Sequence, residues 1–304
     1  MKKVLSIDGG GIRGIAPARI LSWLESKTGR PSAQTWDLIV GTSTGGILAC
    51  GLVHTTDGKT PTYSAAQLLG LYVDHGAEIF HREWYQELAL LKVRYGAAGI
   101  EGVLKKYYGD TKLSASLTDI LVTAFDQSRW EPRFFKSRKA RASASDDTPL
   151  WYAARATSAA PTYFPNIDGL VDGGVMGATN PSMVALVEAR ATWPGEDLFL
   201  LSIGTGHKDG AVSSSGSSGW GELAYLRSLV DMLLDGPEKV VEREVADSLP
   251  PDRYVRIQGT LSGNTPSSAM DDASAGNIQA LIAFADQIIA QNQDALQRVV
   301  ELAK

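Results

Sequence analysis

Three short apolar runs, each ending in a glycine-rich turn, constrain most strongly what this 304-residue chain can fold into. The runs and their turns are residues 3–7 before Asp8-Gly9-Gly10-Gly11-Ile12-Arg13-Gly14, residues 37–40 before Gly41-Thr42-Ser43-Thr44-Gly45-Gly46, and residues 198–203 before Gly204-Thr205-Gly206. Runs that are apolar without alternation predict strands covered on both faces, as in a parallel sheet between helices.

Helical patterns follow the first two turns. Apolar residues recur at helical spacing between Ile15 and Leu24, and residues 46–53 are apolar nearly all round, which predicts a helix buried in the domain centre. Strand, glycine turn and helix, repeated, predict an α/β fold of three layers (αβα) with a central, mostly parallel sheet. Two further strands are expected at 121–125 and 134–135, and a helix over 76–108.

One domain over residues 1–304 is the simplest organisation. The Gly- and Ser-rich residues 208–219 are predicted to be a loop inserted at a strand end, because no independent core follows them. Residues 277–303 carry apolar side chains at helical spacing and predict an amphipathic closing segment.

Composition limits the partners and the compartment. There are 29 Lys and Arg against 34 Asp and Glu, a net charge of −5, which does not support a broad nucleic-acid surface. The single cysteine, Cys50, excludes an internal disulfide framework and is read as a small buried residue. The apolar start of the chain stops at Asp8, short of a signal-peptide core, and the longest near-apolar stretch, residues 45–53, is less than half the ~20 residues that span a bilayer. We therefore expect a cytoplasmic protein.

A local cluster of basic residues lies within 129–141. A solvated hairpin face is the default interpretation, and contact with anionic lipid headgroups is the alternative. The cluster consists of Arg129, Arg133, Lys136, Arg138, Lys139 and Arg141.

The turn around Ser43 has the G-x-S-x-G pattern in the context that a nucleophile requires, with a strand before it and a helix after it. A nucleophilic serine stands on a sharp strand-to-helix turn, so its neighbours Gly41 and Gly45 must be small. The helix N-terminus and the Thr44 amide would then lie where negative charge develops.

The loop from Asp8 to Gly14 has two interpretations. Gly9, Gly11 and Gly14 match the G-x-G-x-x-G dinucleotide fingerprint, but Asp8 would place a carboxylate beside a pyrophosphate. The same consecutive glycine amides form an anion-binding nest suited to the oxyanion of acyl transfer. Arg13 would hold the shape of the loop or neutralise a phosphate headgroup.

A base partner for Ser43 has two candidates. Asp172 ends a short apolar run and is followed by Gly173 and Gly174. His207 follows a strand-end glycine turn, so a Ser43–Asp172–His207 triad is possible. A polar loop histidine with no catalytic role is the interpretation that we prefer for His207.

With these motifs the sequence resembles the patatin-like phospholipases, a family distantly similar to the α/β-hydrolases. The resemblance is strongest to the plant-patatin branch and its bacterial relatives. The matching segments occur in family order between residue 4 and about residue 275. They are residues 8–14, 41–46, 157–165, 172–174, 202–206 and 270–273. One departure is Thr179 before Asn180-Pro181, where the family usually has two asparagines before the proline.

The resemblance implies a serine lipid acyl hydrolase of phospholipase A or lysophospholipase type. Ser43 would be the nucleophile, Asp172 the base, and the Gly10 and Gly11 amides the oxyanion hole. A free aspartate, with a pKa near ~3.9, is a poor base for a hydroxyl. Burial beside an acyl-chain pocket would raise that pKa, and the oxyanion hole would reduce the demand on the base.

No cofactor or metal is implied, because the chain shows no ligand cluster of suitable spacing. Full activity in excess EDTA is expected. The implied partners are a lipid ester and, by peripheral contact, a membrane or micelle surface, without nucleic acid. Two alternatives stay open: an acyltransferase, which shares the acyl-enzyme, and a non-enzymatic nucleotide-binding regulator.

Overall fold

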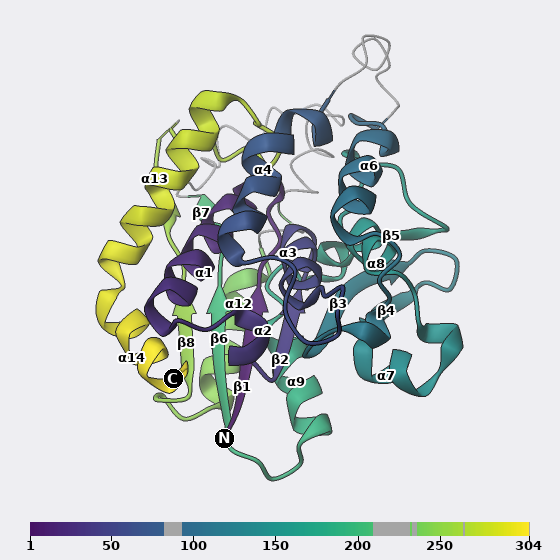
Figure 1. Ribbon diagram of the computed structural model, residues 1–304. Coiled ribbons are helices and arrows are strands. Elements are labelled where there is room, and N and C mark those ends of the chain that lie inside the picture. Colours follow the sequence, from purple (N-terminus) through teal and green to yellow (C-terminus); the bar gives the residue numbers. More distant parts are fainter. Residues whose placement is uncertain (82–92, 209–231, 233–235, 264, 304) are drawn as a thin grey trace.

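A mixed β-sheet occupies the centre of the protein (Figure 1), and it has seven strands within the residues that the structure describes. The computed structural model describes residues 1–81, 93–208, 232, 236–263 and 265–303. The strand order is β4-β3-β2-β1-β6-β8, and β5 also pairs with β3. The strands are β1 (Lys2–Ile7), β2 (Leu38–Gly41), β3 (Asp119–Asp126), β4 (Glu131–Lys136), β5 (Leu170–Asp172), β6 (Leu198–Ile203) and β8 (Tyr254–Ile257).

Five of these strands run parallel, from β3 through β2, β1 and β6 to β8, whereas β4 and β5 are antiparallel to β3. The glycine turns after β1, β2 and β6 therefore lie at one edge of the sheet, the carboxyl edge of the parallel strands. In open α/β sheets this edge is where ligands bind. A short two-stranded ladder, β7 (His207–Lys208) with β9 (Thr260–Leu261), follows β6 and β8.

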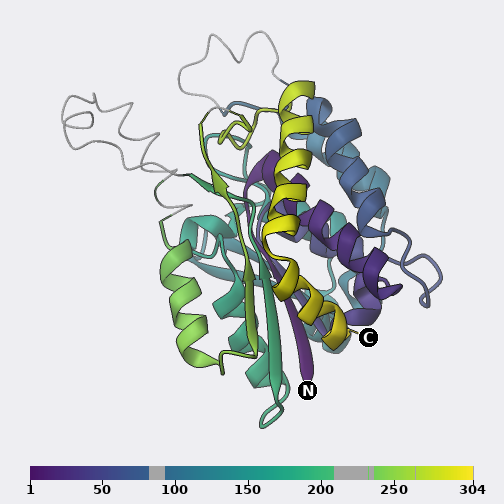
Figure 2. The same ribbon diagram turned by 90° about the vertical axis from the view of Figure 1, so that its left-hand side faces the viewer.

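Helices cover both faces of the sheet (Figure 2). One face carries most of them, and α9 and α12 cover the other. The helices of the larger layer and its edges are α1 (Ile15–Thr28), α2 (Ser32–Thr35), α3 (Thr44–Val53), α4 (Ala65–Ile79), α6 (Ala97–Tyr108), α7 (Ser137–Ala142), α8 (Leu150–Thr157), α13 (Ala275–Gln291) and α14 (Gln293–Ala303). The smaller layer has α9 (Ser182–Thr192) and α12 (Glu238–Ser248). The three-layer α/β fold with a mostly parallel sheet is confirmed.

Alternate residues of each strand supply the two cores. Leu5 and Ile7 of β1 pack on the side of α1, α3 and α13, while Val4 packs on the side of α9 and α12. Both kinds of position are apolar because both faces are covered, which is why the strands show no alternation in the sequence. Every residue of α3 is buried, as expected for a helix that is apolar all round.

Strands β2 and β5 meet end to end along β3. β4 occupies one edge of β3 over residues 121–126, so the strands that pair with its other edge must share that edge. β2 takes the first half, with Gly41 opposite Val122, and β5 takes the second half, with Asp172 opposite Ala124. A separation of two residues along β3 is about 7 Å. The register therefore places Asp172 beside the turn that follows Gly41.

The expected continuous helix over residues 76–108 is wrong. α4 ends at Ile79 and α6 begins at Ala97, and residues 93–96 between them are not helical. The Arg94 and Tyr95 amides donate instead to the carbonyls of Thr162 and Tyr163, so tertiary pairing overrides the apolar spacing. Residues 82–92 of that prediction, and 209–219 of the predicted loop, lie outside the described residues.

The predicted closing segment forms two helices, α13 and α14, which pack their apolar faces on the core. Among the described residues, no helix is both long and apolar enough to span a membrane.

Candidate active site

Ser43 stands on a sharp turn between β2 and α3. Its backbone has φ 55° and ψ −123°, a left-handed conformation that is rare for a residue with a side chain. The two flanking glycines make the turn possible by close approach. A Cβ on Gly41 would overlap the Gly45 carbonyl, and a Cβ on Gly45 would overlap the Ile7 carbonyl of the neighbouring strand. The G-x-S-x-G spacing thus has a steric cause in this fold.

The strained turn is fixed from two sides. The Ser43 amide donates to the Thr157 hydroxyl at the end of α8, 2.8 Å away. The Thr42 hydroxyl donates to the Ala178 carbonyl at 2.6 Å and lies 2.7 Å from the Thr123 hydroxyl of β3. These contacts fix Thr42 and the Ser43 amide, so the backbone that carries the Ser43 side chain is held rigidly.

Asp172 lies against Ser43 at the end of β5 and is only 2% exposed. Burial raises the pKa of Asp172 from an ordinary 3.8 to about 6, and hydrogen bonds from the Ser43 side chain and the Gly174 amide act in the opposite direction. The Gly174 bond, to Oδ1 of the carboxylate, is 2.8 Å long. A Cβ on Gly173 would overlap the Thr123 hydroxyl, so the glycine lets β5 end tightly against β3.

The loop after β1 presents two backbone amides with no partner among the described residues, those of Gly10 and Gly11. The amides on either side are paired: Gly9 donates to the Thr179 carbonyl and Ile12 to the Met270 carbonyl, both at 2.9 Å. Gly11 has φ 59°, and a Cβ there would overlap the Met270 carbonyl.

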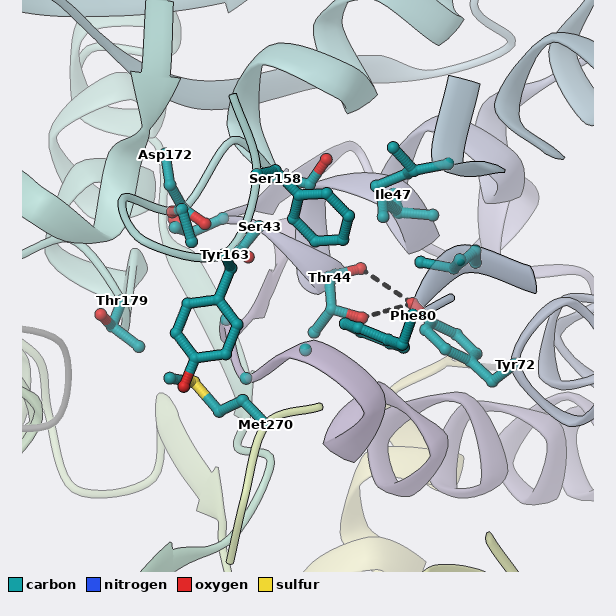
Figure 3. A pocket seen from close by; sticks show the side chains of 18 residues that line it. Ser43, Thr44, Ile47, Tyr72, Phe80, Ser158, Tyr163, Asp172, Thr179 and Met270 are labelled. Atoms are coloured by element: carbon teal, nitrogen blue, oxygen red, sulfur yellow. Dashed lines mark hydrogen bonds between the residues drawn. The ribbon is translucent and has the colours of Figure 1, made fainter. Parts of the chain in front are cut away.

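A narrow cavity of about 50 Å³ joins these elements (Figure 3). It is lined by Ser43, Asp172 and residues Gly9–Gly11, which we call the glycine loop. Its other walls are mainly apolar and aromatic. They include Ile47, Ile79, Phe80, Ile100, Tyr163, Phe164 and Met270. Thr44 also lines the cavity, and its hydroxyl lies 2.5 Å from that of Tyr72. The serine and the carboxyl therefore meet in a pocket that is shaped for an apolar group.

Arg13 and Gly14, which follow Gly9–Gly11 in the chain, do not line the pocket. Arg13 is 1% exposed and donates to the carbonyls of Gly10 (3.3 Å) and Gly206 (3.1 Å). Of the two roles expected for Arg13, holding the loop is therefore the one that this position allows, and contact with a phosphate headgroup is not. A Cβ on Gly14 would overlap the Thr44 hydroxyl, so this glycine lets the loop pack on the serine turn.

Other side chains named from the sequence lie away from the pocket. His207, in β7, is not among the pocket-lining residues, and its Nε2 lies 3.2 Å from the Thr260 hydroxyl. Cys50 is fully buried.

Every residue of the basic cluster 129–141 has a carboxylate partner within 4.0 Å, which leaves little unpaired charge for anionic headgroups. Among the described residues, no group of three or more His, Cys, Asp or Glu side chains could hold a metal ion.

The model of the patatin-like phospholipase family matches residues 5–186, more than half of the chain. The chain belongs to this family. Patatin-like protein 1 of Oryza sativa subsp. indica is 30% identical over 338 residues, covering 95% of this chain and 81% of its own. Patatin-like protein 2 of Arabidopsis thaliana is 30% identical over 344 residues, covering 94% and 82%.

The human GIVD cytosolic phospholipase A2, solved in complex with an inhibitor, aligns at 14% identity and a TM-score of 0.47, covering 99% of this chain and 59% of its own. As a patatin-like phospholipase, the chain is a lipid acyl hydrolase, which is a carboxylic ester hydrolase. The alternative of a non-enzymatic nucleotide-binding regulator is therefore wrong.

Sequence reasoning missed the partners that shape the site. Thr157 and Met270 lie in segments that the resemblance singled out, but no pattern tells that they bind the Ser43 amide and the Ile12 amide. Thr179, the departure from the family pattern, contributes its backbone carbonyl to the Gly9 amide. Because a carbonyl is common to every residue, the substitution leaves this contact intact.

Proposed function

We propose that the enzyme cleaves an acyl ester of a lipid in two steps, through an acyl-enzyme on Ser43, with Asp172 as the base. The observation that carries the proposal is the pairing of Ser43, on its strained turn, with a buried carboxyl in one apolar pocket. Burial raises the pKa of Asp172 to about 6, which brings it nearer to neutral pH than a free aspartate and makes it a better proton acceptor.

In the first step Asp172 takes the proton of the Ser43 hydroxyl while the oxygen attacks the ester carbonyl. The negative charge that forms on the carbonyl oxygen is stabilised by the Gly10 and Gly11 amides, which have no other partner among the described residues. The carbon–oxygen bond of the alcohol breaks, and the proton on Asp172 passes to the leaving alcohol. The acyl group stays on Ser43.

In the second step water attacks the acyl-enzyme and gives its proton to Asp172. The tetrahedral intermediate collapses, the fatty acid leaves, and the proton returns to the Ser43 oxygen. The aromatic and aliphatic walls, including Phe80, Tyr163 and Phe164, suit the acyl chain, whose transfer from water is favourable. We propose that the substrate reaches this pocket from a membrane or micelle surface by peripheral contact.

The test is mass spectrometry of a mixed lipid extract treated with wild type and with Ser43→Ala. We expect wild type to release fatty acid and a lysolipid or alcohol, and Ser43→Ala to release neither. A matched control is Ser114→Ala, which removes the hydroxyl of a second Ser–Asp pair, 2.7 Å from Asp147, outside the pocket. Ser114→Ala should behave as wild type. Activity retained by Ser43→Ala would contradict the proposal.

The same products distinguish hydrolysis from acyl transfer. With a short alcohol added as acceptor, a hydrolase still releases mainly free fatty acid, whereas an acyltransferase yields mainly the new ester. We expect mainly fatty acid.

A further inference from the structure

The segment Ser202-Ile203-Gly204-Thr205-Gly206, one of those that carry the resemblance in the sequence, has no role in the steps above. It lies directly behind the glycine loop. Thr205 follows β6 and is 3% exposed. Its hydroxyl donates to the Gly9 carbonyl at 2.8 Å. Neither Thr205 nor Arg13 lines the pocket, whereas Gly9, Gly10 and Gly11 do. The carbonyls that the two side chains hold therefore point away from the pocket.

The direction of a carbonyl decides the direction of the next amide. In a trans peptide the carbonyl of one residue and the N–H of the next lie in one plane and point opposite ways. Holding the Gly9 carbonyl behind the loop turns the Gly10 N–H toward the pocket. Arg13 acts in the same way on the next unit, because its Nε donates to the Gly10 carbonyl and so turns the Gly11 N–H.

We propose that Thr205 is a positioning residue for the oxyanion hole: its hydroxyl fixes the Gly9–Gly10 peptide so that the Gly10 amide faces the reacting carbonyl. This inference rests on the proposed function, which assigns that amide to the oxyanion. It gives a role to the Gly204-Thr205-Gly206 segment and makes it part of the catalytic apparatus without any contact to substrate.

The close approach of Thr205 also explains the glycine at position 10. A Cβ on Gly10 would overlap the Thr205 hydroxyl and lie too near its Cβ. A bare Cα at this position is what lets the hydroxyl reach the carbonyl of the preceding residue.

The segment that carries Thr205 is itself held in place. The Gly206 amide donates to Oε1 of Gln258 at 2.8 Å, and the Gly206 carbonyl accepts from Arg13. Gln258 in turn donates to Glu238 of α12. A threonine on a flexible loop could not orient a peptide, so this anchoring is a condition of the proposed role.

The experiment compares Thr205→Val, which keeps the shape and removes the hydroxyl, with Thr205→Ser, which keeps the hydroxyl. On a soluble short-chain ester we expect kcat of Thr205→Val to fall about 10- to 100-fold, with KM within about twofold of wild type, because a misaimed donor acts on the transition state alone. Thr205→Ser should stay within about threefold of wild type, since it preserves the aimed donor.

A second readout isolates the oxyanion. An alkyl trifluoromethyl ketone adds to the serine hydroxyl and forms an anionic tetrahedral adduct, so its inhibition constant should rise in Thr205→Val by about the same factor as kcat/KM falls. The matched control is Thr35→Val, which removes another buried Thr hydroxyl bonded to a carbonyl, that of Pro31, in α2. It should leave both values unchanged. If Thr205→Val does not fold, Thr205→Ala takes its place with the same expectations.

The outcomes separate this inference from the proposed function. If Ser43→Ala is inactive and Thr205→Val turns over within twofold of wild type, the role of Thr205 is wrong and the dyad stands. A fall in kcat with an unchanged inhibition constant also overturns it, since the loss then has another origin. An active Ser43→Ala overturns the proposed function itself.

Discussion

Two Asp-Gly-Gly sequences lie at the carboxyl edge of the sheet, Asp8-Gly9-Gly10 and Asp172-Gly173-Gly174, and their aspartates have different partners. Both are almost completely buried, and burial raises the pKa of both. Asp8 is paired with Arg256 of β8 at 2.6 Å, which also contacts Glu238 at 2.6 Å. Asp172 has hydrogen bonds from Ser43 and the Gly174 amide instead, and no cation is among the causes that shift its pKa.

A raised pKa therefore does not by itself identify a catalytic base. Desolvation acts on any buried carboxyl, so it marks Asp8 and Asp172 alike. The partner decides the role: an arginine ties up the Asp8 carboxylate in an ion pair, whereas the serine hydroxyl is a group from which Asp172 can take a proton. We therefore propose that Asp8 supports the glycine loop and that Asp172 takes part in the chemistry.

The largest expected effect is on turnover, in Asp172→Asn. Loss of a general base typically costs about 10²–10⁴ in rate. At pH values above 6, Asp172→Asn should also have a higher free energy of unfolding than wild type. The pKa of Asp172 in the folded state lies above its unfolded value, so its buried charge costs stability as the pH rises from about 4 to about 6, and Asn removes that cost.

The measurements are kcat on a soluble ester and the unfolding midpoint at pH 4 and pH 8. Asp8→Asn is the comparison variant, since it changes the same chemical group at the other site and should lose less activity. Equal losses of activity in the two variants would erase the distinction between the aspartates.

Arg256→Met should have the next largest effect, and on stability. It leaves the buried Asp8 and the partly exposed Glu238 without their shared cation, and breaking a buried pair costs about 3–5 kcal/mol. Urea unfolding measures the change, and Arg243→Met is the control, because Arg243 forms an exposed pair with Asp247. An unfolding free energy unchanged from wild type would show that the ion pairs of Arg256 with Asp8 and Glu238 contribute no stability.

Ser43→Gly tests the strain on the serine side of the dyad. Glycine relieves the left-handed backbone of Ser43, so this variant should unfold at a higher free energy than Ser43→Ala, by about 1 kcal/mol. Both variants lack the hydroxyl and both should be inactive. The difference between their unfolding free energies therefore measures the backbone strain at position 43. Equal stability of the two would mean that the turn stores no strain.

The sheet could be predicted from the sequence because its strands are apolar on both faces. The runs before Gly9, Gly41 and Gly204 correspond to β1, β2 and β6. β8 gave no such signal, since Tyr254 and Arg256 interrupt its apolar pattern, and the cluster around Arg256 was missed with it. The start of α4 was also missed, although Ser64 and Gln67 form a capping box that marks it.

The candidate site was predictable in its residues but not in its geometry. The spacing around Ser43 points to a nucleophile. The end of an apolar run made Asp172 one of two candidate partners beside His207, and the family resemblance implied its role as the base. The meeting of Ser43 and Asp172 depends on β2 and β5 sharing one edge of β3, with Gly41 and Asp172 two positions apart. That register is a long-range property, because 128 residues (42–169) separate the two strands in the chain, and no local pattern encodes it.

The dependence of kcat/KM on pH tests most directly the assignment of Asp172 as the base. On a soluble short-chain ester, we predict that kcat/KM of wild type rises about tenfold per pH unit at low pH, bends near pH 6, and is level above it, because the carboxyl must be ionised to accept the Ser43 proton. Asp8→Asn should keep the bend, and the residual activity of Asp172→Asn should lack it. A bend that persists in Asp172→Asn, or one that disappears in Asp8→Asn or His207→Ala, would contradict the assignment.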